Sequence, residues 1–223
     1  MILRRILAVV LCFGLVCPVF ATGQEPCVAL TFDDGPSGRF TRALLDGLEK
    51  RGVKATFLLC GYRIKEYPKE AQRIYDQGHE IGLHGYSHSC MADMCQEQLE
   101  RELADTLSLL PAGCRPAFLR PPGGKSSAVV LEAARQADLG ILEWSVDPKD
   151  WASHDVGEIE NMVVKSVRDG DVILLHDMSD SSVQAALDIV DKLKAQGFQF
   201  VTVTELARLK GVTIEPGKVY KRF

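Results

Sequence analysis

The stretch VALTFDDGP (residues 28–36) contains the unit that decides the fold of this chain. Residues 28–32 are mostly apolar, and two adjacent carboxylates, Asp33 and Asp34, and a Gly-Pro pair follow them. A short apolar run that ends at turn residues is typical of a buried strand. Residues 42–50 then place apolar side chains at every third or fourth position, which predicts an amphipathic helix. The stretch therefore predicts a buried strand that carries acidic side chains at its carboxyl end and leads into a helix.

The same strand-helix unit recurs along the rest of the chain. Short apolar runs predict strands at residues 28–32, 55–59, 80–83, 117–119, 140–146, 172–175 and 198–203. Amphipathic stretches predict helices at residues 42–50, 68–77, 96–110, 128–137, 159–168, 183–195 and 206–209. Strands that alternate with helices favour a parallel sheet, so we predict an α/β fold, a distorted (β/α) barrel of about seven strand-helix units. Residues 211–223 have no helical period and are expected either to pack across the barrel or to hang free.

The first 21 residues differ in character from the rest of the chain. Arg4 and Arg5 precede an apolar run at residues 6–20. We predict that residues 1–21 are a secretory signal peptide and that residues 22–223 form one domain of ordinary globular composition. The alternative is an uncleaved membrane anchor, because the apolar run approaches the roughly 20 residues that a spanning helix needs. Either reading places the domain outside the cytoplasm, secreted or attached to the cell envelope.

Charge and cysteine content limit the partners and the covalent links of this domain. Residues 1–21 hold two Arg and no acid, so without them Lys+Arg falls from 26 to 24 against 30 Asp+Glu, and the net charge moves from −4 to −6. An acidic domain argues against nucleic acid and anionic lipid headgroups as ligands. Of seven cysteines, Cys12 and Cys17 lie in the predicted leader, so at least one of the remaining five is unpaired. Cys90 and Cys95 are near enough in sequence to be candidates for a disulfide.

Polar clusters follow the predicted strands. In barrels of parallel strands, functional residues gather at the carboxyl ends of the strands, so these clusters are expected to meet at one face. The clusters are Asp33-Asp34, residues 84–88, residues 120–124, residues 147–151 and His176-Asp177.

The first two clusters contain side chains suited to a metal site. One carboxylate of the pair Asp33-Asp34 can bind a metal while its neighbour takes a proton from a water molecule. His84 and His88 are four residues apart, and on a helical turn both rings face the same way. Two imidazoles and one carboxylate leave positions open for water and substrate, as catalytic zinc requires. The alternatives are solvated acids in a turn and two unrelated surface histidines.

All five clusters in order resemble the five motifs of carbohydrate esterase family 4, the polysaccharide deacetylases with a nodulation-protein B homology domain. The resemblance covers roughly residues 27–210 and includes the motifs RPPGG at residues 120–124, DPKDW at residues 147–151 and ILLHD at residues 173–177. It implies a metal-dependent hydrolase that removes N-acetyl groups from an N-acetylglucosamine-type polysaccharide such as peptidoglycan, a chitin-like chain or poly-N-acetylglucosamine. It also implies one divalent ion as cofactor, zinc first, with cobalt or manganese as alternatives.

The resemblance assigns roles to the residues around the metal. Asp33 is similar to the catalytic base of the family, and Asp34 to its carboxylate ligand. His84 and His88 match the two imidazole ligands. Arg120 matches the arginine that pairs with the base and orients it.

The resemblance likewise assigns the acid and the substrate contacts. His176 matches the general acid, and Asp150 the carboxylate that supports it. The backbone N–H of Gly123 matches a donor to the oxyanion of the reaction. Trp151 and Leu174 match residues that form an apolar pocket around the acetyl methyl group.

Two positions depart from the family pattern, and two others have a structural interpretation. Gly85 stands where the family usually has Ser or Thr, which predicts looser positioning of the ligand loop. Gly123 stands where many members carry Tyr, so that wall of the site lacks a side chain. We interpret Trp144 as a core residue and Asp147 as an acid that stabilises a turn.

Three other functions fit the same pattern. The first is an esterase that removes O-acetyl groups from a polysaccharide, with the same site and different outer loops. The second is a catalytically inactive glycan-binding homologue, which should lack a base, an acid or a ligand, whereas this sequence has all of them. The third is a structural metal site, which would have closed coordination. We expect a monomer.

Overall fold

The computed structural model describes residues 25–223. The predicted leader, residues 1–21, and its cleavage lie outside the described residues. Among the residues that are described, no helix is long and apolar enough to cross a membrane.

Within residues 25–223, eight strands form one sheet, and all the ladders between them are parallel. The strands are β1 (Cys27–Asp33), β2 (Thr56–Leu59), β3 (Glu80–Leu83), β4 (Phe118–Leu119), β5 (Gly140–Leu142), β6 (Val172–His176), β7 (Gln199–Phe200) and β8 (Val219–Tyr220). Their order is β6-β1-β2-β3-β4-β5-β8, and β7 pairs with β1 beyond this path. The longest strand, β1, therefore has β2, β6 and β7 as partners.

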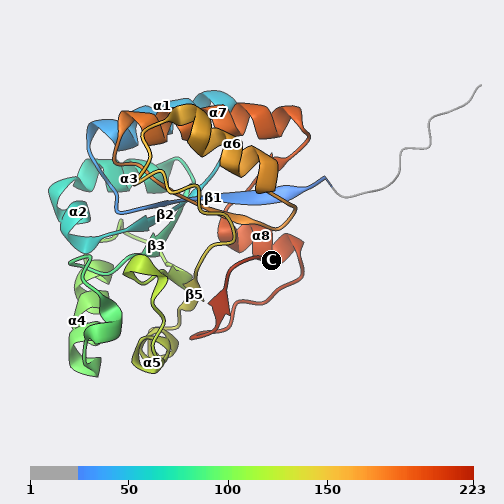
Figure 1. The fold of residues 1–223 in the computed structure, drawn as a ribbon. Coiled ribbons are helices and arrows are strands. Elements are labelled where there is room, and N and C mark those ends of the chain that lie inside the picture. Colours follow the sequence, from blue (N-terminus) through green and yellow to red (C-terminus); the bar gives the residue numbers. More distant parts are fainter. Residues whose placement is uncertain (1–24) are drawn as a thin grey trace, which may run out of the picture.

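The two ends of this sheet come together. A parallel bridge joins Val146 to Ile173 of β6, and an antiparallel bridge joins Asp171 to Arg222, just after β8. The Arg222 guanidinium also donates to Asp171 Oδ1, at 2.6 and 2.9 Å. The curled sheet with helices around it confirms the predicted α/β architecture of a distorted barrel, and residues 219–222 pack across its seam (Figure 1).

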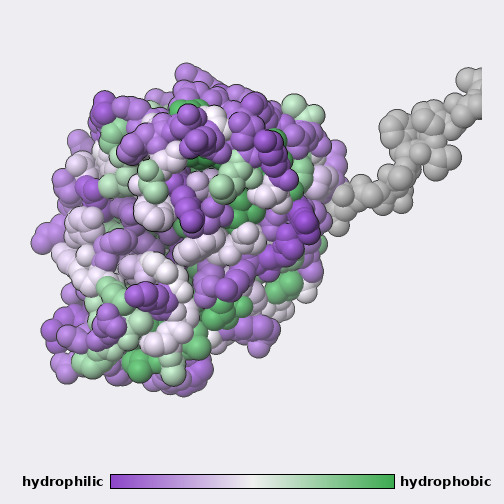
Figure 2. Space-filling model, viewed as in Figure 1, coloured by the Kyte–Doolittle hydropathy of each residue, from purple (hydrophilic) through white to green (hydrophobic). Residues whose placement is uncertain are grey.

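Helices follow the strands and cover the outside of the sheet. They are α1 (Arg39–Arg51), α2 (Gly61–Glu66), α3 (Pro68–Asp76), α4 (Gln96–Leu107), α5 (Ala128–Gln136), α6 (Val156–Ser166), α7 (Asp180–Ala195) and α8 (Val203–Leu209), with short 3₁₀ turns η1 (Met91–Asp93) and η2 (Pro122–Gly124). Helices α1, α6 and α7 lie together over one side of the barrel (Figure 1). On the face seen in Figure 2, hydrophobic residues occur in small scattered groups among hydrophilic ones.

The alternation of side chains along β1 explains how the fold presents Asp33. Val28, Leu30 and Phe32 point to the hydrophobic core shared with the outer helices. Ala29 lies in a second core with side chains of other strands. Since successive strand residues point to opposite faces, Asp33 continues the second series and lies inside the mouth of the barrel.

Some predicted elements differ from those in the structure. The strand predicted at 140–146 ends at Leu142, because the carbonyls of Leu142 and Glu143 accept hydrogen bonds from Arg120 instead of a neighbouring strand. The strand predicted at 198–203 ends early, because Thr202 caps the amino end of α8. Helix α2 and strand β8 were not predicted.

The predicted Cys90–Cys95 disulfide is absent. All five cysteines within residues 25–223 are free thiols. Cys95 is the N-cap of α4, where its side chain accepts from the Gln98 backbone and its own N–H donates to Gln98 Oε1 at 2.9 Å. Cys90 precedes the turn η1 and is only partly buried.

Candidate active site

A cavity of about 380 Å³ lies at the carboxyl ends of β1, β3 and β6. It is lined by Asp33, Asp34, His84, His88, Gly123, Trp144, Asp147, Trp151, Leu174 and His176. Arg120 and Asp150 are buried behind this lining, where Arg120 bonds to Asp33 and Asp150 to His176. The structure therefore brings together in one place all the site residues that the sequence predicts.

Asp34, His84 and His88 form a compact cluster on one side of the cavity. The ligand atoms that they offer all lie within 4.8 Å of one another. Asp34 Oδ1 is 3.2 Å from His84 Nε2 and 3.0 Å from His88 Nε2. Asp34 adopts a φ of 72° and His88 a φ of 60°, in the left-handed region that residues other than glycine rarely adopt. Such backbone strain is concentrated at functional sites.

The donor atoms of this cluster fit a cation. His84 Nδ1 lies 2.6 Å from the carbonyl oxygen of Arg120, and a carbonyl can only accept, so Nδ1 carries the proton. In the neutral ring, Nε2 then offers a lone pair toward Asp34. Asp34 Oδ1 is itself buried and accepts no hydrogen bond from residues 25–223. The lone pairs of Asp34 Oδ1 and His84 Nε2 repel each other. A metal ion between the two atoms would remove this repulsion, because both atoms could coordinate it.

The electrostatics of the cluster agree with its geometry. Burial alone would raise the pKa of Asp34, but the adjacent His84 and His88 rings outweigh burial and hold that pKa well below its usual range. Asp34 in turn raises the pKa of His88. The cluster thus combines an ionised carboxylate with an imidazole that binds a proton more tightly than usual. A metal ion would compete with that proton for the imidazole nitrogen.

Asp33 lies beside this cluster and is held by Arg120. Asp33 is 3% exposed, and its Oδ1 accepts a hydrogen bond of 2.6 Å from Arg120. The guanidinium is fully buried and also donates to the Thr31 hydroxyl at 2.8 Å. Its remaining bonds go to the carbonyls of Leu142 and Glu143, at 3.1 and 3.0 Å. Asp33 therefore has one fixed orientation, with a permanent positive charge behind it.

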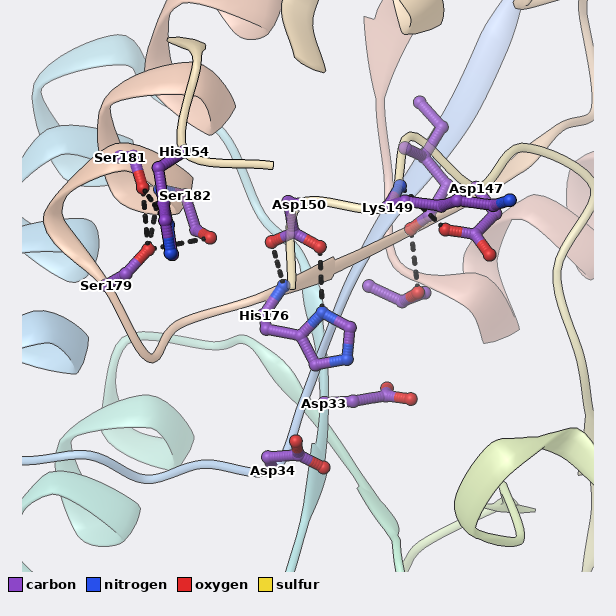
Figure 3. A network of polar contacts seen from close by, with 12 residues as sticks. Asp33, Asp34, Asp147, Lys149, Asp150, His154, His176, Ser179, Ser181 and Ser182 are labelled. Atoms are coloured by element: carbon purple, nitrogen blue, oxygen red, sulfur yellow. Dashed lines mark hydrogen bonds and ion pairs between the residues drawn. The ribbon is translucent and has the colours of Figure 1, made fainter. Parts of the chain in front are cut away.

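His176 stands opposite, at the end of β6, and is held by Asp150 (Figure 3). Asp150 Oδ1 is 2.8 Å from His176 Nδ1, and Oδ2 accepts the His176 backbone N–H at 2.8 Å. Burial alone would lower the pKa of His176, but the hydrogen bond and charge of Asp150 raise it to about 9. Nδ1 is thus committed to Asp150, and Figure 3 shows the ring between Asp150 and the pair Asp33-Asp34.

Comparison with known proteins identifies the family. The family model described as polysaccharide deacetylase matches residues 21–142. The chain belongs to the polysaccharide deacetylase family. Solved structures of carbohydrate esterase family 4 share its fold, as the five motifs predicted.

Three proteins illustrate how similar this chain is to other members of the family. A peptidoglycan-N-acetylglucosamine deacetylase of Bacillus cereus is 38% identical over 193 residues, which cover 84% of this chain and 91% of that protein. A peptidoglycan-N-acetylmuramic acid deacetylase of Bacillus subtilis is 36% identical, and the match covers 84% of this chain but 40% of that protein. A family 4 acetyl xylan esterase from Clostridium thermocellum, solved with a cobalt ion, superposes with a TM-score of 0.82 at 38% identity over 88% of this chain and 98% of that one.

The remaining wall of the deacetylase cavity is apolar and partly open. Leu174 is buried, whereas Trp151 is 62% exposed at the rim. A Cβ at Gly123 would meet no atom within 4 Å, so the missing Tyr of many relatives leaves free space there. Gly124 packs against the Trp144 indole, where a Cβ would be 2.8 Å from the ring.

The sequence interpretation of the polysaccharide deacetylase missed part of this lining. Trp144, interpreted as core, does pack against the second core and also lies in the cavity wall, with its ring 5.6 Å from the Arg120 guanidinium. Asp147 accepts the Lys149 backbone N–H at 2.9 Å, as expected of a turn residue, and also faces the cavity. The signal that could have revealed both is their position just beyond β5, at the same end of the sheet as the other polar clusters.

The loop between the two histidines is also held differently from the expectation. Gly85 predicted loose positioning, yet the carbonyls of Gly85 and Tyr86 accept from the first N–H groups of α2. Tyr86 and Ser87 donate their own N–H groups to Glu102 of α4, at 2.6 and 2.9 Å. The sequence offered no indication of this role for Glu102.

Proposed function

We propose that this polysaccharide deacetylase is a metal-dependent hydrolase that removes N-acetyl groups from an N-acetylglucosamine-type polysaccharide. Peptidoglycan, a chitin-like chain and poly-N-acetylglucosamine are the substrate candidates. One observation carries this proposal: Asp34 Oδ1 and the Nε2 atoms of two imidazoles converge at one place. The same cavity also contains buried Asp33 and His176, whose pKa is raised. The name of the Bacillus cereus relative supports the choice of N-acetylglucosamine.

Asp34, His84 and His88 would hold the ion. Zinc suits two imidazoles and one carboxylate, and cobalt and manganese are the alternatives. When bound, the ion would supply Lewis acidity toward the acetyl carbonyl and toward a water molecule. Three protein ligands would leave positions for both, in contrast to a structural metal site.

On the base side, Asp33 accepts the proton of the water that attacks the acetyl carbon. Arg120 fixes the carboxylate and keeps a positive charge behind it, so the free oxygen of Asp33 points to the cavity. Attack places a negative charge on the former carbonyl oxygen. The N–H of Gly123, a residue of the cavity lining, donates to this oxyanion.

On the acid side, His176 donates a proton to the leaving nitrogen as the carbon–nitrogen bond breaks. Asp150 keeps the ring charged at neutral pH, because the pKa of His176 is about 9. Trp151 and Leu174 enclose the acetyl methyl group. The products are a free sugar amine and acetate.

The direct test is acetate release from N-acetylglucosamine oligomers and from peptidoglycan before and after metal removal. We expect a chelator to abolish release and added zinc, cobalt or manganese to restore it, because no side chain of the cluster can replace a Lewis acid. Full activity of the metal-stripped enzyme would contradict the proposed metal dependence.

A second candidate is an esterase acting on O-acetyl groups, favoured by the likeness to the Clostridium thermocellum acetyl xylan esterase. An alcohol leaves more readily than an amine, so the ester reaction depends less on protonated His176. Acetate release from acetylated xylan compared with chitin oligomers separates the two candidates.

We also propose that the domain acts outside the cytoplasm, as a monomer, after export directed by residues 1–21. The support is the leader pattern and the peptidoglycan named for the two Bacillus relatives. The intact mass of the secreted protein would reveal whether residues 1–21 are removed.

A further inference from the structure

The two proposed histidine ligands are anchored very differently. His84 directly follows β3 and is buried, and its Nδ1 is fixed by the Arg120 carbonyl. The side chain of His88 is 44% exposed and comes from a loop with a left-handed backbone. The position of His88 therefore depends on how firmly residues 85–87 are held.

Residues 85–87 are held by hydrogen bonds from two helices, α2 and α4. The N–H groups of Gly61 and Tyr62 in α2 donate to the carbonyls of Gly85 and Tyr86, at 2.9 and 3.0 Å. In α4, a single carboxylate oxygen of Glu102 accepts two consecutive N–H groups of the loop. Glu102 is the only side chain within residues 25–223 that the hydrogen bonds place on these two donors.

The packing around the loop leaves little freedom for an alternative arrangement. Gly85 has a φ of 77°, and a Cβ there would lie 3.2 Å from Glu102 Oε2. A Cβ at Gly61 would overlap the Tyr86 ring. Both glycines thus permit close approach of the loop to α2 and α4.

We propose that Glu102 is a positioning residue that sets the metal affinity of the site through the loop that carries His88. Hydrogen bonds to a charged acceptor are stronger than neutral ones, and Glu102 makes two of them to the same loop. Without this carboxylate the N–H groups of Tyr86 and Ser87 lose the side chain that accepts from them, and His88 Nε2 is held less firmly 3.0 Å from Asp34. The inference rests on the proposed metal-dependent function.

The experiment measures the zinc affinity of the full chain by competition with a chelator, for Glu102→Ala, Glu102→Gln and the control Glu97→Ala. Glu97 lies on the same helix, and it pairs only with the exposed Arg101 among the described residues. We expect Glu102→Ala to weaken zinc binding by about 10-fold to 100-fold, as removal of outer partners of metal ligands typically does. Glu102→Gln should recover part of this loss, because its amide oxygen can accept both N–H groups. Glu97→Ala should bind zinc like the wild type.

A second readout is the absorption spectrum of the cobalt-loaded proteins, which reports ligand geometry and should change in Glu102→Ala alone. The melting temperature of each metal-free variant separates loss of affinity from loss of folding. Wild-type zinc affinity in folded Glu102→Ala, or in Glu102→Gln if the alanine variant does not fold, together with an unchanged cobalt spectrum would overturn the inference. A wild-type chain that binds neither zinc nor cobalt nor manganese would instead overturn the proposed function.

Discussion

The two walls of the cavity contain the same kind of ion pair in opposite orientations. In the pair Asp33–Arg120 the guanidinium is buried and the carboxylate faces the cavity. In the pair Asp150–His176 the carboxylate is buried and the imidazole faces the cavity. The partner that faces the cavity therefore differs: a carboxylate on one wall and, on the other, an imidazole whose pKa the buried carboxylate raises to about 9.

The largest expected effect comes from neutralising the acceptor. Asp33→Asn should lower kcat by about 10²-fold to 10⁴-fold, the usual value of a general base, because an amide cannot take the proton of water. Zinc content should remain near that of the wild type, since Asp34, His84 and His88 are intact. The matched variant Asp34→Asn should lose zinc. If Asp33→Asn loses zinc and Asp34→Asn keeps it, the two aspartates have exchanged roles.

The next effect concerns stability on the same wall. Arg120→Met should destabilise the fold by about 3 to 5 kcal/mol, because it leaves Asp33 buried without its cation. Urea unfolding measures this loss. In a double-mutant cycle with Asp33→Asn, the two losses should not add, because the asparagine removes the stranded charge. Additive losses would mean that the guanidinium acts through its carbonyl partners and not through Asp33.

The smallest effect is a pH shift on the opposite wall. The pKa of His176 is about 9, above the ordinary value of 6.5, so the proton donor is lost only as the pH rises through about 9. In Asp150→Asn, burial still lowers the pKa of His176, but the negative charge of Asp150 that raises it is gone. The alkaline limb of the kcat profile should therefore move to lower pH. The maximal rate should fall modestly, and zinc should be retained. An alkaline limb that stays in place would show that Asp150 does not set the protonation of His176.

Elements with strong side-chain patterns were predictable, and those made by backbone pairing were not. The buried run of β1 and the amphipathic period of helices such as α4 and α7 follow directly from the sequence. The two residues of β8 pair with β5 through their backbone and, unlike those of β4, are not part of a longer apolar run. The six residues of α2 are too few to show a period.

In the candidate site, too, some features could be predicted from the sequence and others could not. Ordered motifs predicted which side chains meet in the cavity, because each motif follows a strand that ends at the same face. The contact of Glu102 with the loop between His84 and His88 could not be predicted. Helix α4 carries several acids, and nothing in their spacing distinguishes the one that accepts from this loop. The cavity position of Trp144 was hidden because the predicted strand at 140–146 was too long.

Asp150 holds both the backbone N–H and Nδ1 of His176, so Nε2 is the ring nitrogen that remains to exchange a proton with the cavity. In the proposed reaction each cycle leaves Asp33 protonated and His176 neutral, on opposite walls. Restoring the starting state requires Asp33 to lose one proton and His176 to gain one. Nε2 is the ring nitrogen that takes up this proton, and the water that refills the cavity after acetate departs is the source of it. Product release and enzyme resetting are therefore coupled, and a bound product that excludes water would hold the enzyme in its spent protonation state.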